Sequence, residues 1–172
     1  MSSDSDSIEP TQERRDITVR PEGFTIRLTP MGFHLYASEW LKAGQLVASQ
    51  VDPFRPVAYY LFARSIELSL KSFLLIHRIS LAELKSRQLG HDLTALLARA
   101  SALGLPQLSD EQHIVMAKAN EYYTEKVFEY FAMQEAVTGF QRMPELSLLG
   151  DLASQLVNDL RQPCLDASDD PL

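Results

Sequence analysis

A long apolar stripe between Pro56 and Ile76 constrains the fold more than any other feature of the sequence. Apolar or small residues recur there every three or four positions, as on one face of a helix with 3.6 residues per turn. They are Ala58, Leu61, Phe62, Ser65, Ile66, Ser69, Leu70, Phe73 and Leu74. The helix has two alternative start signals, Asp52 with Pro53 and Arg55 with Pro56. The stripe therefore predicts one long helix with an inward face.

Shorter stretches with helical signals lie on both sides of this helix. They are residues 30–50, 80–84, 91–103, 109–123 and 144–163. Ser109 and Gln112 have the spacing of a capping box, and Pro144 is a residue that commonly opens a helix. These signals predict an all-α fold, an up-and-down bundle of four to five helices. The conformation of residues 126–141 stays open, because their aromatic-rich pattern is ambiguous.

The two ends of the chain differ in composition from the middle. Residues 1–16 and 163–172 are rich in Ser and Asp and too polar to offset the entropy lost on ordering, so both are expected to be disordered acidic tails. Residues 17–30 alternate apolar and polar side chains around Pro21 and Gly23, which predicts a short extended arm or a β-hairpin. Residues 31–162 are then expected to form one helical domain.

Charge and composition exclude several classes of protein. The formal net charge is −7, and each acidic tail carries −3, which leaves −1 for the middle of the chain. A general RNA binder usually has a basic field, so RNA binding here would need a local patch. No apolar run approaches the ~20 residues that span a bilayer. The start lacks the features of a secretory signal, and Cys164 is the only cysteine, so we expect a cytoplasmic protein without an internal disulfide.

Two segments resemble a known family. Residues 63–77, ARSIELSLKSFLLIH, contain Glu67 and Lys71 in a Glu-x-x-x-Lys pattern, and residues 89–97, LGHDLTALL, contain His91 and Asp92 at a His-Asp-Leu helix start. In type, order and spacing they are similar to the second and third helices of HEPN (higher eukaryotes and prokaryotes nucleotide-binding) domains. Residues 120–130, NEYYTEKVFEY, are a weaker echo of the family's Tyr-rich segment. The resemblance implies a helical bundle that binds a nucleotide or RNA.

The residues of these segments have two interpretations. Glu67 and Lys71 lie four apart on one helical face, the orientation of an ion pair, and Asp92 in a first helical turn complements the positive end of the helix dipole. The structural interpretation is a salt bridge beside a helix cap with a satisfied histidine. The functional interpretation is a polar pocket at one end of the bundle that binds a nucleotide or an RNA backbone. Its candidate residues are Glu67, Lys71, His91, Asp92, Asn120, Tyr123 and Lys126.

The sequence lacks the usual signatures of catalysis. HEPN ribonucleases have an Arg, then a polar residue, then a His, with four to six residues between Arg and His. Only three residues separate Arg87 from His91, and no other histidine fits, although Lys85 lies at the right distance to replace the arginine as a phosphate contact. The four histidines and one cysteine have no metal-ligand spacing, and no glycine loop for phosphates is present. We expect no catalytic residue, no metal and no cofactor.

Aromatic residues suggest a second surface. Phe33, Tyr36, Trp40, Tyr59 and Tyr60 are candidates for an interface between subunits, because aromatic side chains dominate interface cores, with core packing as the alternative. The sequence thus predicts a non-catalytic HEPN-like domain that binds a nucleotide, RNA or a protein partner and self-associates. Candidate partners are a second copy in a homodimer and a separately encoded nucleotidyltransferase or antitoxin. A degenerate ribonuclease or toxin-type protein and a purely structural bundle stay open as alternatives.

Overall fold

A computed structural model describes residues 28–50, 55–127 and 143–167. In these residues all regular structure is helical, which confirms the all-α prediction. The helices are α1 (Pro30–Ala48), α2 (Arg55–Ile76), α3 (Leu81–Leu84), α4 (Leu93–Ser101), α5 (Asp110–Thr124) and α7 (Leu146–Asp166). No helix of the described residues is both long enough and apolar enough to cross a membrane.

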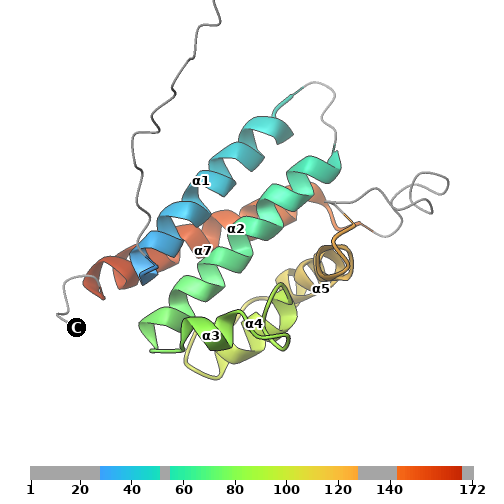
Figure 1. Cartoon of the computed structure of the whole chain (residues 1–172). Helices are drawn as coiled ribbons and strands as arrows, with labels where there is room; N and C mark the ends of the chain where they lie inside the picture. The colour runs from blue at the N-terminus through green and yellow to red at the C-terminus, as the bar shows by residue number, and fades with distance from the viewer. Residues whose placement is uncertain (1–27, 51–54, 128–142, 168–172) are drawn as a thin grey trace, which may run out of the picture.

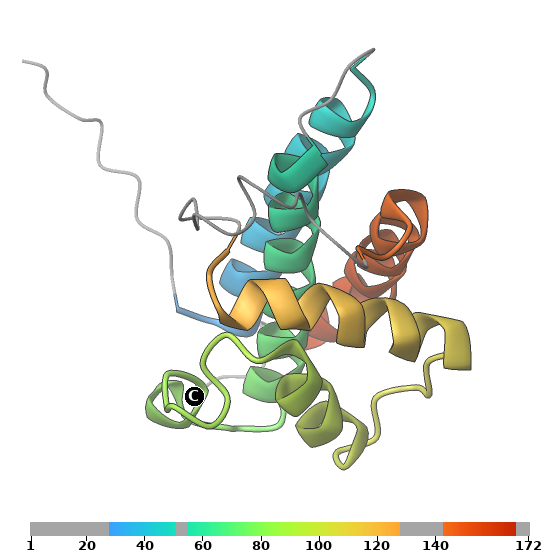
Figure 2. The same ribbon diagram turned by 90° about the vertical axis from the view of Figure 1, so that its right-hand side faces the viewer.

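Helix α2 lies at the centre of the bundle and packs antiparallel to α1, which precedes it in the chain (Figure 1). Helix α7 packs against both α1 and α2, and α4 and α5 cover another part of α2. Figures 1 and 2 together show that α5 runs across α2 instead of alongside it. Helices α1 and α2 are antiparallel, as in an up-and-down bundle, whereas α7 runs in the same direction as α2, because Gly150 lies by Phe62 and Cys164 by Ser72.

Helices α1, α3, α4 and α5 begin at residues whose side chains accept from free backbone N–H groups. Ser109 accepts from the amide of Gln112 at 3.2 Å, and the Gln112 side chain accepts from the amide of Ser109 at 2.9 Å, so the expected capping box is confirmed. Asp92 is the N-cap of α4, whose first residue is Leu93. The helix expected from residue 91 thus begins two residues later, and His91 lies in the preceding turn.

The core forms where α1 and α7 meet the inward stripe of α2. Phe62 is 3% exposed and lies between glycines of the two neighbouring helices. A Cβ atom added to Gly44 would lie 2.7 Å from the Phe62 ring, and one added to Gly150 would lie 3.1 Å from it. The two glycines let α1 and α7 approach α2 closely on both sides of this ring.

The boundary expected at residue 163 is also wrong, and the helix expected from Pro144 begins at Leu146. Helix α7 continues through Pro163 to Asp166, whereas residues from 163 onward were expected to form a disordered tail. Cys164 is fully buried and packs in the core, so the last turn of α7 contacts the core. The acidic composition of the residues around Cys164 gives no sign of this contact in the sequence. The expected tail at residues 1–16, nearly all of the arm at 17–30, and most of 126–141 lie outside the described residues.

Candidate functional site

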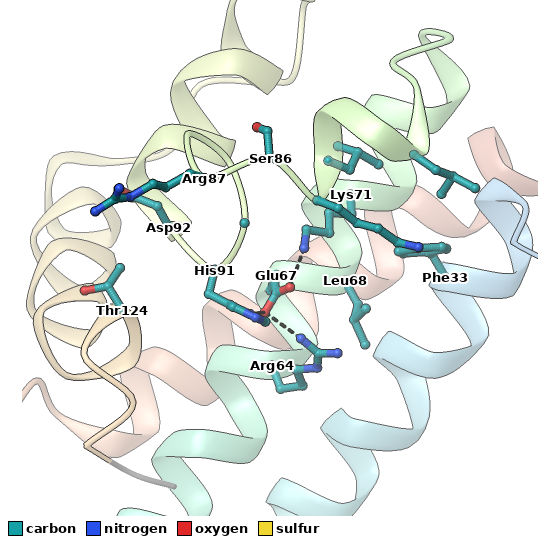
Figure 3. A pocket seen from close by; sticks show the side chains of 14 residues that line it. Phe33, Arg64, Glu67, Leu68, Lys71, Ser86, Arg87, His91, Asp92 and Thr124 are labelled. Atoms are coloured by element: carbon teal, nitrogen blue, oxygen red, sulfur yellow. Dashed lines mark hydrogen bonds and ion pairs between the residues drawn. The ribbon is translucent and has the colours of Figure 1, made fainter. Parts of the chain in front are cut away.

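The carboxylate of Glu67 on α2 is the centre of a buried polar cluster. Its side chain is fully buried, and Lys71 Nζ donates to Oε1 at 2.6 Å. Oε2 accepts from Arg64 Nη1 at 2.8 Å, from His91 Nδ1 at 3.1 Å and from the hydroxyl of Tyr123. Figure 3 shows Arg64, Lys71 and His91 converging on this carboxylate. The cluster joins α2 to α5 and to the turn before α4, so a single side chain ties three parts of the bundle together.

The cluster keeps Glu67 ionised. Burial by itself would raise the pKa of Glu67, but the His91 hydrogen bond and the charges of Arg64 and Lys71 outweigh it and lower the pKa to about 2. Burial, followed by the charge of Glu67, raises the pKa of Tyr123 well above its usual value, so this phenol stays protonated. The carboxylate can therefore act as a permanent acceptor for the groups around it.

Glu67 also determines how His91 presents its ring. A carboxylate only accepts hydrogen bonds, so Nδ1 of His91 carries the hydrogen that points at Glu67. The His91 side chain is 47% exposed, and its ring edge contacts Tyr123 with centroids 6.2 Å apart. The buried acid thus leaves the opposite nitrogen, Nε2, available to a bound molecule.

Asp92 and Asn120 form a helix cap next to this cluster. Asp92 Oδ1 accepts from the amide of Ala95 at 2.9 Å and from Asn120 Nδ2 at 3.1 Å. Asn120 Oδ1 in turn accepts from the amide of Leu93 at 2.7 Å. Burial alone would raise the pKa of Asp92, but these hydrogen bonds lower it. The structural interpretation as a helix cap therefore describes Asp92 and Asn120 well.

A pocket of about 610 Å³ opens over Glu67, with α1, α2, α3, α5 and the 85–92 turn around it (Figure 3). It is lined by Phe33, Arg64, Glu67, Leu68, Lys71, Leu81, Leu84, Lys85, Ser86, Arg87, Gly90, His91, Asp92 and Thr124. Four of these residues are Lys or Arg, two are carboxylates, and four supply large apolar side chains. The volume falls within the range of small-molecule sites, and the lining combines an apolar wall with cations.

The pocket brings together four of the seven residues expected there: Glu67, Lys71, His91 and Asp92. Tyr123 contacts Glu67 but does not line the pocket. Asn120 does not line the pocket either, and it contacts one lining residue, Asp92, by a hydrogen bond. Lys126 is not among the lining residues, so its expected place was wrong. The physical reason is that α5 ends at Thr124, and Lys126 then adopts a left-handed φ of 57° with an exposed side chain, away from the helical register.

Other pocket residues were missed or considered for another role. Arg64 lies three residues before Glu67, a spacing that predicts an ion pair on one helical face. Lys85 and Arg87 were considered only as part of a ribonuclease motif, and both line the pocket. Phe33 was expected at a subunit interface, and it forms part of the pocket wall.

The remaining interface candidates have different environments. Tyr59 is 4% exposed, and its hydroxyl donates to the carbonyl of Pro144, so this candidate is a core residue of the monomer. Trp40 and Tyr60 are half-buried and contact each other edge to face, with ring centroids 6.0 Å apart. Tyr36 is 41% exposed on α1. Of these four aromatic residues, only Tyr36 is exposed.

The described residues contain no group of three or more His, Cys, Asp or Glu side chains that could hold a metal ion. No protein-family model, curated protein or solved structure matches this chain.

Proposed function

We propose that this chain is a HEPN-like domain that binds a nucleotide in the pocket over Glu67. The observation that carries the proposal is the concentration of Arg64, Lys71, Lys85 and Arg87 around one small pocket of a chain with a net charge of −7. Cationic donors bind phosphate oxygens by charge-assisted hydrogen bonds. A local cluster of this kind fits one small ligand better than an extended RNA, because an RNA backbone is usually held by a broad basic surface.

The apolar wall supports the same ligand class. The wall consists of Phe33 on α1, Leu68 on α2 and Leu84 on α3. Phe33 provides a ring against which a base can pack. The cations and the apolar wall meet in one cavity, so a molecule with a phosphate and a flat organic body would contact both. A nucleotide has these two parts.

The test measures nucleotide binding by isothermal titration calorimetry. We expect the wild type to bind adenosine or guanosine phosphates, and a Lys85→Ala, Arg87→Ala variant to bind about a hundredfold more weakly or worse, because hydrogen bonds to charged groups contribute about 1.5–3 kcal/mol each. Arg55→Ala, Lys118→Ala is the matched control, since it removes the same charges from exposed positions outside the pocket. Equal loss in both variants, or no binding by the wild type at millimolar nucleotide, would contradict the proposal.

The pair of Glu67 and His91 favours a second candidate, a degenerate ribonuclease. A buried carboxylate that orients an imidazole is an arrangement used by general bases, and Arg87 lines the same pocket as His91. RNA incubated with purified wild type would then be cleaved, and His91→Ala would abolish the cleavage. Intact RNA after incubation with the wild type would rule this candidate out and leave nucleotide binding unaffected. Recording the oligomeric mass of the same samples tests the predicted self-association.

A further inference from the structure

The cations of the pocket fall into two groups. Glu67 binds Arg64 and Lys71, so much of their charge is already compensated. Within the part of the chain that the structure describes, Lys85 and Arg87 make no ion pair, and both are exposed. The turn that follows α3 therefore carries two uncompensated cations at the mouth of the pocket.

His91 adds a third polar group from the same turn. Its Nδ1 is bound to Glu67, so Nε2 is the ring nitrogen that a ligand can reach. Lys85, Arg87 and His91 lie within seven consecutive residues, and Gly90, which also lines the pocket, has no side chain to obstruct a ligand there. One short segment thus supplies two cationic donors and a histidine ring, while the apolar wall comes from α1, α2 and α3.

The charge of the whole lining indicates which phosphate it suits. Four cations against the carboxylates of Glu67 and Asp92 leave a formal charge of +2. A phosphomonoester has a charge of about −1.5 to −2 at pH 7, so it would neutralise the pocket. An internal phosphodiester carries about one negative charge and would leave part of the cationic charge uncompensated.

On the basis of the proposed nucleotide binding, we infer that this pocket selects a terminal phosphate, a phosphomonoester attached to a nucleoside, over an internal phosphodiester. Lys85 and Arg87 donate to the phosphate oxygens, and His91 lines the same pocket beside them. The source of the phosphomonoester is a free mononucleotide or the phosphorylated end of an oligonucleotide, since both present the same chemistry.

The test uses the full chain and ligands that differ only at the phosphate. Calorimetry would compare adenosine 5′-monophosphate with 3′,5′-cyclic adenosine monophosphate, which has the same base and sugar but a diester. We expect the monoester to bind about tenfold more tightly, and the preference to disappear in the Lys85→Ala, Arg87→Ala variant. The guanosine, cytidine and uridine pairs repeat the comparison in case the pocket prefers another base.

The outcomes separate this inference from the proposed function. Equal affinity for the two members of every pair would overturn the selection of a terminal phosphate and leave nucleotide binding intact. Failure of every mononucleotide and oligonucleotide to bind would overturn both. A trinucleotide with a 5′-phosphate, compared with the same trinucleotide with a 5′-hydroxyl, identifies the source. Tight binding of the phosphorylated form alone assigns the pocket to strand ends as well, whereas binding of mononucleotides only assigns it to free nucleotides.

Discussion

Replacing Glu67 by glutamine should destabilise the fold by about 3 kcal/mol, because the change removes the buried charge that the cations of Arg64 and Lys71 share. Breaking a buried ion pair by removing one partner costs about 3–5 kcal/mol. The lower end applies here, because the Arg64 side chain keeps 27% of its surface exposed and can be partly rehydrated. The lowered pKa of Glu67 agrees in direction, because it means that the folded state favours the charged carboxylate.

Urea unfolding followed by circular dichroism at pH 7 measures this change. Glu83→Gln is the matched control, since Glu83 is 45% exposed and its contact with Arg99 is 3.4 Å long. We expect the control to change the free energy of unfolding by less than about 0.5 kcal/mol. A loss of less than about 1 kcal/mol in Glu67→Gln would refute the reasoning that the Glu67 cluster is a buried, charge-compensated centre of the bundle.

The pH dependence of the unfolding free energy, compared between the wild type and Glu67→Gln, gives a second test of the Glu67 cluster. The pKa of Glu67 is lower in the folded state than in the unfolded state, so its contribution to stability is complete above the unfolded value of 4.5. The contribution is then lost as the pH falls from about 4.5 toward 2. The difference between wild type and Glu67→Gln should therefore shrink over this range. A constant difference down to pH 2.5 would contradict the lowered pKa.

Three further changes test other parts of the fold. Gly44→Ala should destabilise the protein by about 1–3 kcal/mol in urea unfolding, because the new methyl group would lie 2.7 Å from the Phe62 ring. Burial, and then the charge of Arg161, lowers the pKa of His34, so stability should fall as the pH drops below 6.5, and His34→Gln should flatten this part of the urea midpoint–pH profile. Asn120→Ala should cost about 1 kcal/mol in thermal or urea unfolding, because it leaves a backbone amide at the start of α4 without its acceptor.

Each of these changes has a control at an exposed position. Leu46→Ala, on the exposed side of α1, should be close to neutral, and equal loss in it and in Gly44→Ala would argue against the close packing of α1 on Phe62. His113→Gln, at an exposed histidine, is the control for His34→Gln. Glu121→Ala, next to Asn120 but exposed, should leave the stability unchanged. An Asn120→Ala variant as stable as the wild type would contradict the capping role.

The helices were predictable from the sequence where they depend on local patterns of residues. The stripe from Ala58 to Leu74 predicted α2, and the spacing of Ser109 and Gln112 predicted the start of α5, because both are determined within one or two helical turns. Pro163 was taken as a stop signal. That prediction failed since burial of Cys164 in the core, a tertiary effect, keeps the last turn of α7 helical.

The candidate site shows the same division. Glu67 and Lys71 were expected to pair because they lie four apart on one helix, and they do. The contact of His91 with Glu67, across 24 residues, depends on how the turn before α4 packs on α2, so no local spacing predicts it. Lys126 was expected in the pocket as part of the Tyr-rich segment 120–130, but α5 ends at Thr124 and the backbone at Lys126 is left-handed.

The measurement that tests the central claim most directly is a nuclear magnetic resonance titration of the full chain with adenosine 5′-monophosphate and, in parallel, the other mononucleotides. We predict that the largest backbone amide shifts fall in residues 84–92 and around Glu67, where the pocket opens. Saturable shifts confined to those residues would support a nucleotide site over Glu67. Shifts confined to the exposed side of α1, around Leu35 and Leu46, or no shifts at millimolar nucleotide, would contradict it.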